Sequence, residues 1–303
     1  MATCTCTERH TGEREFSVGG SATGFRRLPV AEGALDPAPG VHRRRRVELF
    51  GVPFDRVSLL EAAARIGRWM EEGTSGRARM VVTPDTTALM RARRDPLLRW
   101  AYHQADLVTP DGTGIVWASR RLGFPFEERV SGIDLVEELL RRGATEGYRF
   151  FFLGARPGVA QAAAERVRRR YPGLRIVGTH HGYFSPQEEP ALVDAIHAAG
   201  PDALLVGLGV PKQELWMLRN RGALEVPVMI GIGGSFDVLS GRLPRAPKSW
   251  QRMGLEWLWR VLREPRRLGR VGAIPQFMGL VLLQRALSSL SSSLSSSSIG
   301  PGG

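Results

Sequence analysis

The residues best suited to carry chemistry form one short run, Pro110-Asp111-Gly112-Thr113-Gly114, which directly follows an apolar stretch. A carboxylate at a strand end, flanked by glycines that let a ligand approach the backbone, is suited to act as a general base or to bind a hydroxyl group. The same residues also fit a plain Asp-Gly turn, which is the more frequent interpretation of such a run on its own. Asp111 is therefore a candidate base that needs support from other motifs.

Two glycine-rich runs offer places where phosphate groups could bind. The first extends from Gly207 to Glu214 and opens into an expected helix, so that free backbone N–H groups, Lys212 and Gln213 lie together. It lacks both the Walker pattern and the Gly-x-Gly-x-x-Gly spacing of dinucleotide folds. The second, residues 231–237, repeats the pattern at the next strand end. The two runs, with Gly209 and Gly233 as substrate-binding candidates, predict a diphosphate-sized platform.

The elements that must position these residues alternate regularly along the chain. Short apolar runs that stop at Gly, Pro or Asp predict strands at 80–85, 106–112, 150–154, 174–178, 203–207 and 228–231. Helical periodicity falls between them at 132–146, 158–171, 188–199 and 212–221. The pattern predicts an α/β fold, Rossmann-like, with a mostly parallel sheet and helices on both faces. Ligands of such sheets bind beyond the carboxyl ends of the strands, where the Gly, Asp and Thr residues gather.

The composition changes at both ends of the chain. We expect a disordered leader at 1–46, a catalytic domain at 47–241, a basic helical appendage at 242–287 and a Ser/Gly-rich disordered tail at 288–303. The stretch 242–285 holds ten Arg or Lys residues against two Glu, a net charge of +8 out of +12 for the chain. It also carries Trp250, Trp257 and Trp259, so we expect it to dock on an anionic membrane surface. The alternative is a packed helical pair with a solvated basic face.

Several classes of site and partner are excluded or disfavoured. The only cysteines, Cys4 and Cys6, are too close to bridge and too few for a zinc site, which fits a reducing cytosol. His180 and His181 are adjacent, and in an extended chain adjacent side chains face opposite ways, so they are poor metal partners. No HxxxH or paired-carboxylate metal spacing appears elsewhere in the sequence, so we expect no metal in the chemistry, and we expect no cofactor. No run of apolar residues is long enough to span a bilayer. A peripheral position at the inner face of the plasma membrane is the expectation, with a homo-oligomer left open.

Taken together, the motifs resemble the WecG/TagA/CpsF family of bacterial glycosyltransferases (glycosyltransferase family 26) over roughly residues 47–278. The resemblance rests on the order of many short blocks, namely 83–85, 110–114, 129–132, 171–174, 182–184, 209–214, 233–237, 245–247 and 254–260. It implies inverting, metal-independent transfer from a UDP-sugar to an undecaprenyl-diphosphate-linked saccharide in cell-surface polysaccharide synthesis. UDP-N-acetylmannosamine, its uronic acid or a related hexose are the donors it implies.

The resemblance also implies a role for each candidate residue. Asp111 looks like the general base that deprotonates the acceptor hydroxyl, and Arg129 would face the acceptor or the leaving diphosphate. The implied donor contacts are Thr83 and Asp85 beside the sugar and diphosphate, Gln213, and Tyr183 and Asp237 around the uracil. Arg260, Arg267 and Arg270 would close over the site when the appendage docks on a membrane and would neutralise the departing UDP, as a metal does elsewhere.

Position 85 departs from the family, which usually has Asn there. An ionised Asp only accepts hydrogen bonds and would repel a diphosphate, so Asp85 either binds sugar hydroxyls or is held by a nearby Arg. A catalytically altered family member acting as a scaffold is therefore one alternative function. A nucleotide-binding α/β protein of another class, such as a dehydrogenase, is disfavoured by the missing dinucleotide fingerprint. A nucleic-acid-binding protein is disfavoured because the basic residues cluster with Trp and not along a reader motif.

Overall fold

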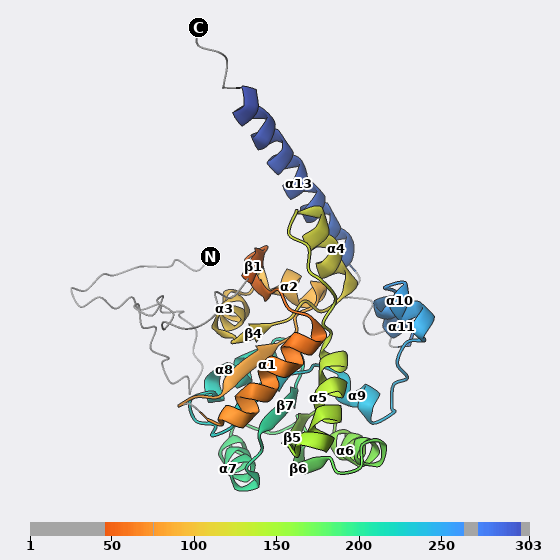
Figure 1. Cartoon of the computed structure of the whole chain (residues 1–303). Coiled ribbons are helices and arrows are strands. Elements are labelled where there is room, and N and C mark those ends of the chain that lie inside the picture. Colours follow the sequence, from red (N-terminus) through yellow and green to blue (C-terminus); the bar gives the residue numbers. More distant parts are fainter. Residues whose placement is uncertain (1–45, 75, 264–271, 298–303) are drawn as a thin grey trace, which may run out of the picture. The chain divides into compact units, whose positions relative to one another are not determined.

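The centre of the molecule is a six-stranded sheet in which every neighbouring pair of strands is parallel (Figure 1). The computed structural model describes residues 46–74, 76–263 and 272–297. The strand order is β4-β3-β8-β7-β5-β6. These strands are β3 (Arg79–Val82), β4 (Leu107–Val108), β5 (Arg149–Gly154), β6 (Arg175–His180), β7 (Ala203–Gly207) and β8 (Val228–Gly231). The predicted α/β class and parallel sheet are confirmed.

Helices cover both faces of this sheet, as the apolar strands require. One face packs on α1 (Leu59–Glu72), α5 (Gly132–Glu146), α6 (Val159–Arg170) and α9 (Ser235–Leu239). The other packs on α2 (Thr86–Ala92), α3 (Pro96–Gln104), α4 (Thr113–Arg121), α7 (Glu189–Ala199) and α8 (Lys212–Asn220). Of these, α5 to α8 match the helices expected from periodicity to within one residue at each end.

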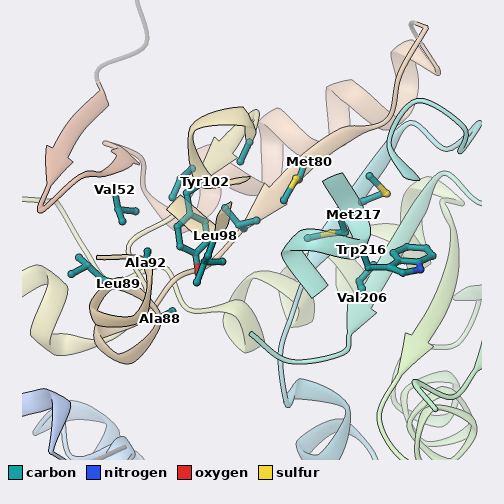
Figure 2. Close-up of a cluster of buried hydrophobic side chains, with 14 of the residues drawn as sticks. Val52, Met80, Ala88, Leu89, Ala92, Leu98, Tyr102, Val206, Trp216 and Met217 are labelled. Carbon is teal, nitrogen blue, oxygen red and sulfur yellow. The ribbon is translucent and has the colours of Figure 1, made fainter. Parts of the chain in front are cut away.

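Alternation of side chains along each strand divides the core into two halves. On β7, Leu204 and Val206 enter the core beneath α2, α3 and α8, whereas Ala203 and Leu205 enter the opposite core. Figure 2 shows the first of these clusters, where Trp216 and Met217 of α8 gather with Val206. Because successive residues of a strand point to opposite faces, a strand buried on both sides must be apolar throughout. This is why the strands appear in the sequence as unbroken apolar runs.

A hairpin that the sequence did not predict is anchored at the end of β4. It consists of β1 (Arg46–Leu49) and β2 (Val52–Asp55), paired antiparallel. The buried carboxylate of Asp55 accepts a hydrogen bond from the Val108 N–H at 2.8 Å, and Arg46 donates to both its oxygens at 3.1 Å. The Asp55 charge is thus compensated where it is buried, and the hairpin fixes the edge strand that precedes Asp111.

The basic C-terminal part forms three described helices, α10 (Lys248–Arg252), α11 (Glu256–Arg263) and α13 (Ala273–Ser297). Phe277 and Val281 of α13 are buried against the core, and the Phe277 ring lies 5.7 Å from that of Phe50. Helix α13 continues to Ser297, beyond residue 287, where the sequence predicts an irregular tail. Ser288 and Ser289 donate hydrogen bonds to the carbonyls of Gln284 and Arg285, one turn earlier, which lets serine remain helical. Among the described helices, none has the length and apolarity needed to cross a bilayer.

Candidate functional site

Asp111 lies where the loop after β4 meets the start of α5. The loop is fixed by the Val130 N–H, which donates to the Pro110 carbonyl at 3.0 Å, and by the Thr109 hydroxyl, which donates to the Val130 carbonyl at 3.1 Å. The Asp111 Oδ2 then accepts a hydrogen bond from the N–H of Gly132, the first residue of α5, at 3.2 Å. The partial positive charge at the start of this 15-residue helix favours an ionised carboxylate.

Thr83 connects this loop to the middle of the sheet. Its hydroxyl donates to the carbonyl of Gly231 at the end of β8, at 3.3 Å. A Cβ placed on Gly132 would lie only 2.9 Å from the Thr83 hydroxyl, so the start of α5 approaches β3 as closely as a glycine allows. Thr83, Asp111 and the end of β8 therefore form one continuous edge of the sheet, as the parallel arrangement predicts.

Asp85 has a local structural partner. It is the N-cap residue of α2, and its Oδ1 accepts a hydrogen bond from the Ala88 N–H at 2.8 Å. A Cβ on Gly112 would stand 3.9 Å from the Asp85 Cβ, so Asp85 borders the Asp111 loop. Asn and Asp cap helices about equally well. The Asn that the resemblance implies at this position would thus form the same helix cap as Asp85.

Arg129 lies within a network of charges that joins α5 to the C-terminal helices. It donates to Glu256 of α11 at 2.9 Å and to Asp134 at 3.2 Å, and Arg245 donates to Asp134 and Glu137. Burial tends to lower the pKa of Arg129, but Glu256, Asp111 and Asp134 outweigh it and the pKa is raised. The guanidinium of Arg129, which was predicted to face a diphosphate, therefore binds a carboxylate of α11.

The same network stabilises the ionised form of the Asp134 carboxyl group. Burial tends to raise the pKa of this carboxyl, but hydrogen bonds from Ser131 and Arg245 outweigh burial and lower the pKa. Next to the network, the Thr113 hydroxyl donates to the Gly254 carbonyl at 3.1 Å, immediately before α11. The short run that contains Asp111 is therefore in contact with the C-terminal segment.

The turns after β5, β7 and β8 pack backbone against backbone. Gly154 has φ of +140°, and a Cβ there would lie 2.7 Å from the Gly207 Cα. A Cβ on Gly207 would in turn lie 2.9 Å from the Gly233 carbonyl oxygen. The Ala155 N–H donates to the Gly207 carbonyl at 3.0 Å. We call these three turns, with Gln213 and Glu214 beneath them, the glycine edge.

Gln213 lies beneath the turn after β8. Its side chain is 3% exposed, its Oε1 accepts a hydrogen bond from the Gly233 N–H at 3.0 Å, and its Nε2 donates to Glu214 at 2.9 Å. Both ends of the amide are therefore engaged with the protein. Gly209, in the preceding turn, has φ of +77°, a conformation that favours glycine.

The remaining candidates lie on separate elements. Tyr183 is 67% exposed in the loop after β6, and Asp237 belongs to α9 after β8, with β7 and β5 between these strands. The loop of Tyr183 folds back toward β5 and β7, because the Gly182 N–H donates to the Ala155 carbonyl at 2.9 Å. Arg260 belongs to α11, and Arg267 and Arg270 lie outside the described residues.

The two histidines differ from the expectation that their side chains face opposite ways. Their ring centroids are 4.6 Å apart, and the His180 Nδ1 lies 2.8 Å from the His181 carbonyl oxygen. The reason is that β6 ends at His180, so the backbone turns before the next side chain. Strand alternation does not apply across a strand end.

Sequence reasoning missed Glu214 and Glu256 as members of the site. Glu214 is 1% exposed, and Glu256, at 7%, reaches Arg129 from 127 positions away. The sequence gives no signal that Glu214 is buried, because it follows Lys212 and Gln213 at the start of a helix. The cap formed by Asp85 did have a signal, because an Asp directly before a helical stretch is a common N-terminal cap.

Comparison with known proteins agrees with this geometry. The model of the glycosyl transferase WecG/TagA/CpsF family matches residues 47–290. Relatives in Staphylococcus aureus strains MW2 and MRSA252 are each named N-acetylglucosaminyldiphosphoundecaprenol N-acetyl-beta-D-mannosaminyltransferase. Each is 34% identical over 233 residues, which cover 77% of this chain and 91% of the relative. The chain therefore belongs to the WecG/TagA/CpsF family and is a glycosyltransferase.

Proposed function

We propose that this enzyme transfers a sugar from a UDP-sugar to an undecaprenyl-diphosphate-linked saccharide, with inversion and without a catalytic metal. The donor is UDP-N-acetylmannosamine, its uronic acid or a related hexose. The S. aureus relatives are named for β-linked N-acetylmannosaminyl transfer to N-acetylglucosaminyl-diphosphoundecaprenol. Nucleotide sugars of this class are α-linked at the anomeric carbon, so a β product requires an inverting displacement.

The observation that carries the proposal is the position of Asp111 at the sheet edge. Its carboxylate is oriented by the Gly132 N–H, and Thr83 and the end of β8 lie beside it. In the proposed step the acceptor hydroxyl attacks the anomeric carbon while Asp111 accepts its proton. The new C–O bond forms as the bond from that carbon to the diphosphate oxygen breaks. One correctly placed base suffices, because inversion takes a single displacement.

The glycine edge is the proposed site of the donor diphosphate. A Cβ placed on Gly209 or on Gly233 would meet no atom within 4 Å, so both turns leave room for a ligand to approach the main chain. Gly209 and Gln213 would shape this part of the site, and Tyr183 and Asp237 would contact the uracil from the loops after β6 and β8. Asp85, as a helix cap, needs no separate role in donor choice, which weakens the argument for a non-catalytic scaffold.

We propose that cationic side chains neutralise the negative charge of the leaving UDP. Arg129 lies beside Asp111, and its guanidinium already binds carboxylates. We propose that Arg260, Arg267 and Arg270 join it when residues 242–287 dock on the inner face of the plasma membrane. The exposed apolar side chains Met253, Trp257 and Leu262, interleaved with cations, suit the headgroup region of an anionic bilayer.

Release of UDP tests this function directly. The enzyme is mixed with anionic vesicles that carry an N-acetylglucosaminyl-diphospholipid, and UDP-sugars are supplied one at a time. We expect UDP release with at least one donor, and Asp111→Asn should lower kcat by about 100-fold or more while leaving the unfolding midpoint unchanged. Absence of UDP release from every UDP-sugar would refute the transferase mechanism. An unchanged rate in Asp111→Asn would refute only the role of Asp111 as the base.

A further inference from the structure

An acidic side chain is buried directly beneath the proposed diphosphate site. Glu214 lies in the first turn of α8 and is 1% exposed. Its Oε1 accepts the hydrogen bond from the Gln213 Nε2, whereas its Oε2 is buried without a hydrogen-bond partner among the described residues. A buried carboxylate with an unsatisfied oxygen is costly unless it serves another purpose.

Glu214 is the lower end of a relay to the turn after β8. Its Oε1 holds the amide nitrogen of Gln213, which leaves the amide oxygen of Gln213 facing the Gly233 N–H at 3.0 Å. Without an acceptor for the nitrogen, the amide could rotate and present its NH2 group to that N–H. Two donors would then face each other and the turn would lose its anchor. The turn's backbone is also packed against Gly207, so the relay acts on both turns of the glycine edge.

The surroundings of Glu214 disfavour its charge. Burial is the main cause that raises its pKa to about 7, and Asp85 at the start of α2 adds to it, against smaller opposing effects of Gln213, a backbone amide and Arg91 of α2. Tyr102 of α3, labelled in Figure 2, is close enough to be affected by the charge of Glu214. Its buried hydroxyl also has no hydrogen-bond partner among the described residues. Burial, and then the charge of Glu214, raise the pKa of Tyr102, so the phenol stays neutral.

We infer that Glu214 is a positioning residue that fixes the glycine edge through Gln213, and that it is a neutral acid when a donor diphosphate is bound. This rests on the proposed function. A neutral carboxyl still offers its carbonyl oxygen to the Gln213 amide, whereas an ionised one adds a negative charge beneath the diphosphate. Donor binding therefore takes up a proton from solvent, and by linkage donor affinity falls as Glu214 ionises.

The test is the affinity for UDP, measured by calorimetry on the full chain from about pH 6 to about pH 8.5. Glu214→Gln keeps the acceptor for Gln213 and cannot ionise. We expect the ratio of wild-type to Glu214→Gln dissociation constants to rise about fivefold across this range, as a like charge near the diphosphate requires. The titration of UDP itself is common to both proteins and cancels in the ratio. A ratio that stays constant would refute the neutral-acid part of the inference.

The relay itself is tested by a variant that lacks the acceptor and by a measurement that needs no UDP. Glu214→Met should weaken UDP binding about tenfold and speed hydrogen exchange of the Gly233 amide, while Glu214→Gln leaves that exchange slow. Glu165→Met, the same change as Glu214→Met at an exposed position on α6, is the matched control. Unchanged exchange in Glu214→Met would overturn the relay. Should Glu214→Met fail to fold, the pH-dependent ratio with Glu214→Gln still decides the neutral-acid part of the inference.

These outcomes separate the inference from the function on which it rests. A wild-type chain that binds no UDP at any pH would refute the proposed function, and the exchange of Gly233 would still decide whether the relay exists. A further readout is stability. Because burial raises the pKa of Glu214 from 4.5 to about 7, the wild type should lose stability relative to Glu214→Gln as the pH rises through that window.

Discussion

The glycine edge and the junction around Arg129 are held together in opposite ways, although they belong to the same site. The glycine edge is backbone packed on backbone, and the side chains of Gln213 and Glu214 beneath it supply one amide and one acid. The second region, which we call the ionic junction, consists of Arg129, Asp134, Arg245 and Glu256, whose charged side chains are between 10% and 24% exposed.

The difference indicates that the glycine edge is rigid, whereas the ionic junction can open. Close backbone packing has no second arrangement of similar energy, so the glycine edge fixes the positions of main-chain groups. The ion pairs of the junction join α5 to the C-terminal helices by partly exposed side chains and are weakened by salt, so the junction can separate while the sheet stays folded. This suits the proposed docking of the C-terminal segment on a membrane.

The largest expected effect is a substitution in the glycine edge. Gly154→Ala should destabilise the protein by about 3 kcal/mol or more, because the new Cβ meets the Gly207 backbone and φ of +140° is strained for alanine. The unfolding midpoint in denaturant measures it. Gly222→Ala is the matched control, since Gly222 has open space around it and no left-handed φ. Equal midpoints for the two variants would show that the backbone of the glycine edge can shift, and that it is not more rigid than the ionic junction.

A smaller and more local effect is expected in the ionic junction. Glu256→Gln removes one charge from the largely buried pair with Arg129, so the segment of α10 and α11 should open about tenfold more readily. The effect should be confined to this segment, because the sheet and its two cores keep their contacts. Protease cleavage within residues 248–263 measures the opening. The difference from the wild type should shrink when salt is raised from about 0.05 M to about 0.5 M, because screening weakens the pair.

Glu72→Gln provides the comparison for that variant. It breaks an ion pair with Arg79 in which Glu72 is 53% exposed, away from the C-terminal helices. Cleavage within residues 248–263 should then match the wild type. If both variants open the segment equally, the opening does not depend on the ionic junction.

The smallest effect is expected at Asp85, the acidic helix cap that borders the Asp111 loop. Asp85→Asn should change stability by less than about 0.5 kcal/mol and leave the order of preference among UDP-sugars unchanged, because either residue caps α2. Asp95→Asn makes the same exchange at the cap of α3 and serves as its control. A switch of donor in Asp85→Asn alone would assign this carboxylate to sugar recognition after all.

The sequence predicted the parts of the site that follow from strand ends, and missed those that depend on long-range packing. Apolar runs ending in Gly or Asp revealed the strands, and a parallel sheet brings their carboxyl ends to one edge, which is why Thr83 and Asp111 were found. The contact of Glu256 with Arg129 depends on where the C-terminal helices fold back, and no local pattern encodes it. The burial of Glu214 likewise follows from the packing of α8 under β7 and β8, not from its neighbours in the chain.

The strand order has a consequence for how the protein is made. Among the strands that the structure describes, β8 is the last to leave the ribosome, yet it lies between β3 and β7. Until residues 228–231 emerge, the six-stranded sheet can form only as two parts, β4-β3 and β7-β5-β6, each with an open edge that favours wrong pairing. Insertion of β8 closes both edges and brings Gly231 to the Thr83 hydroxyl in the same event. Translation thus delays the assembly of a working enzyme until most of the chain has been synthesised.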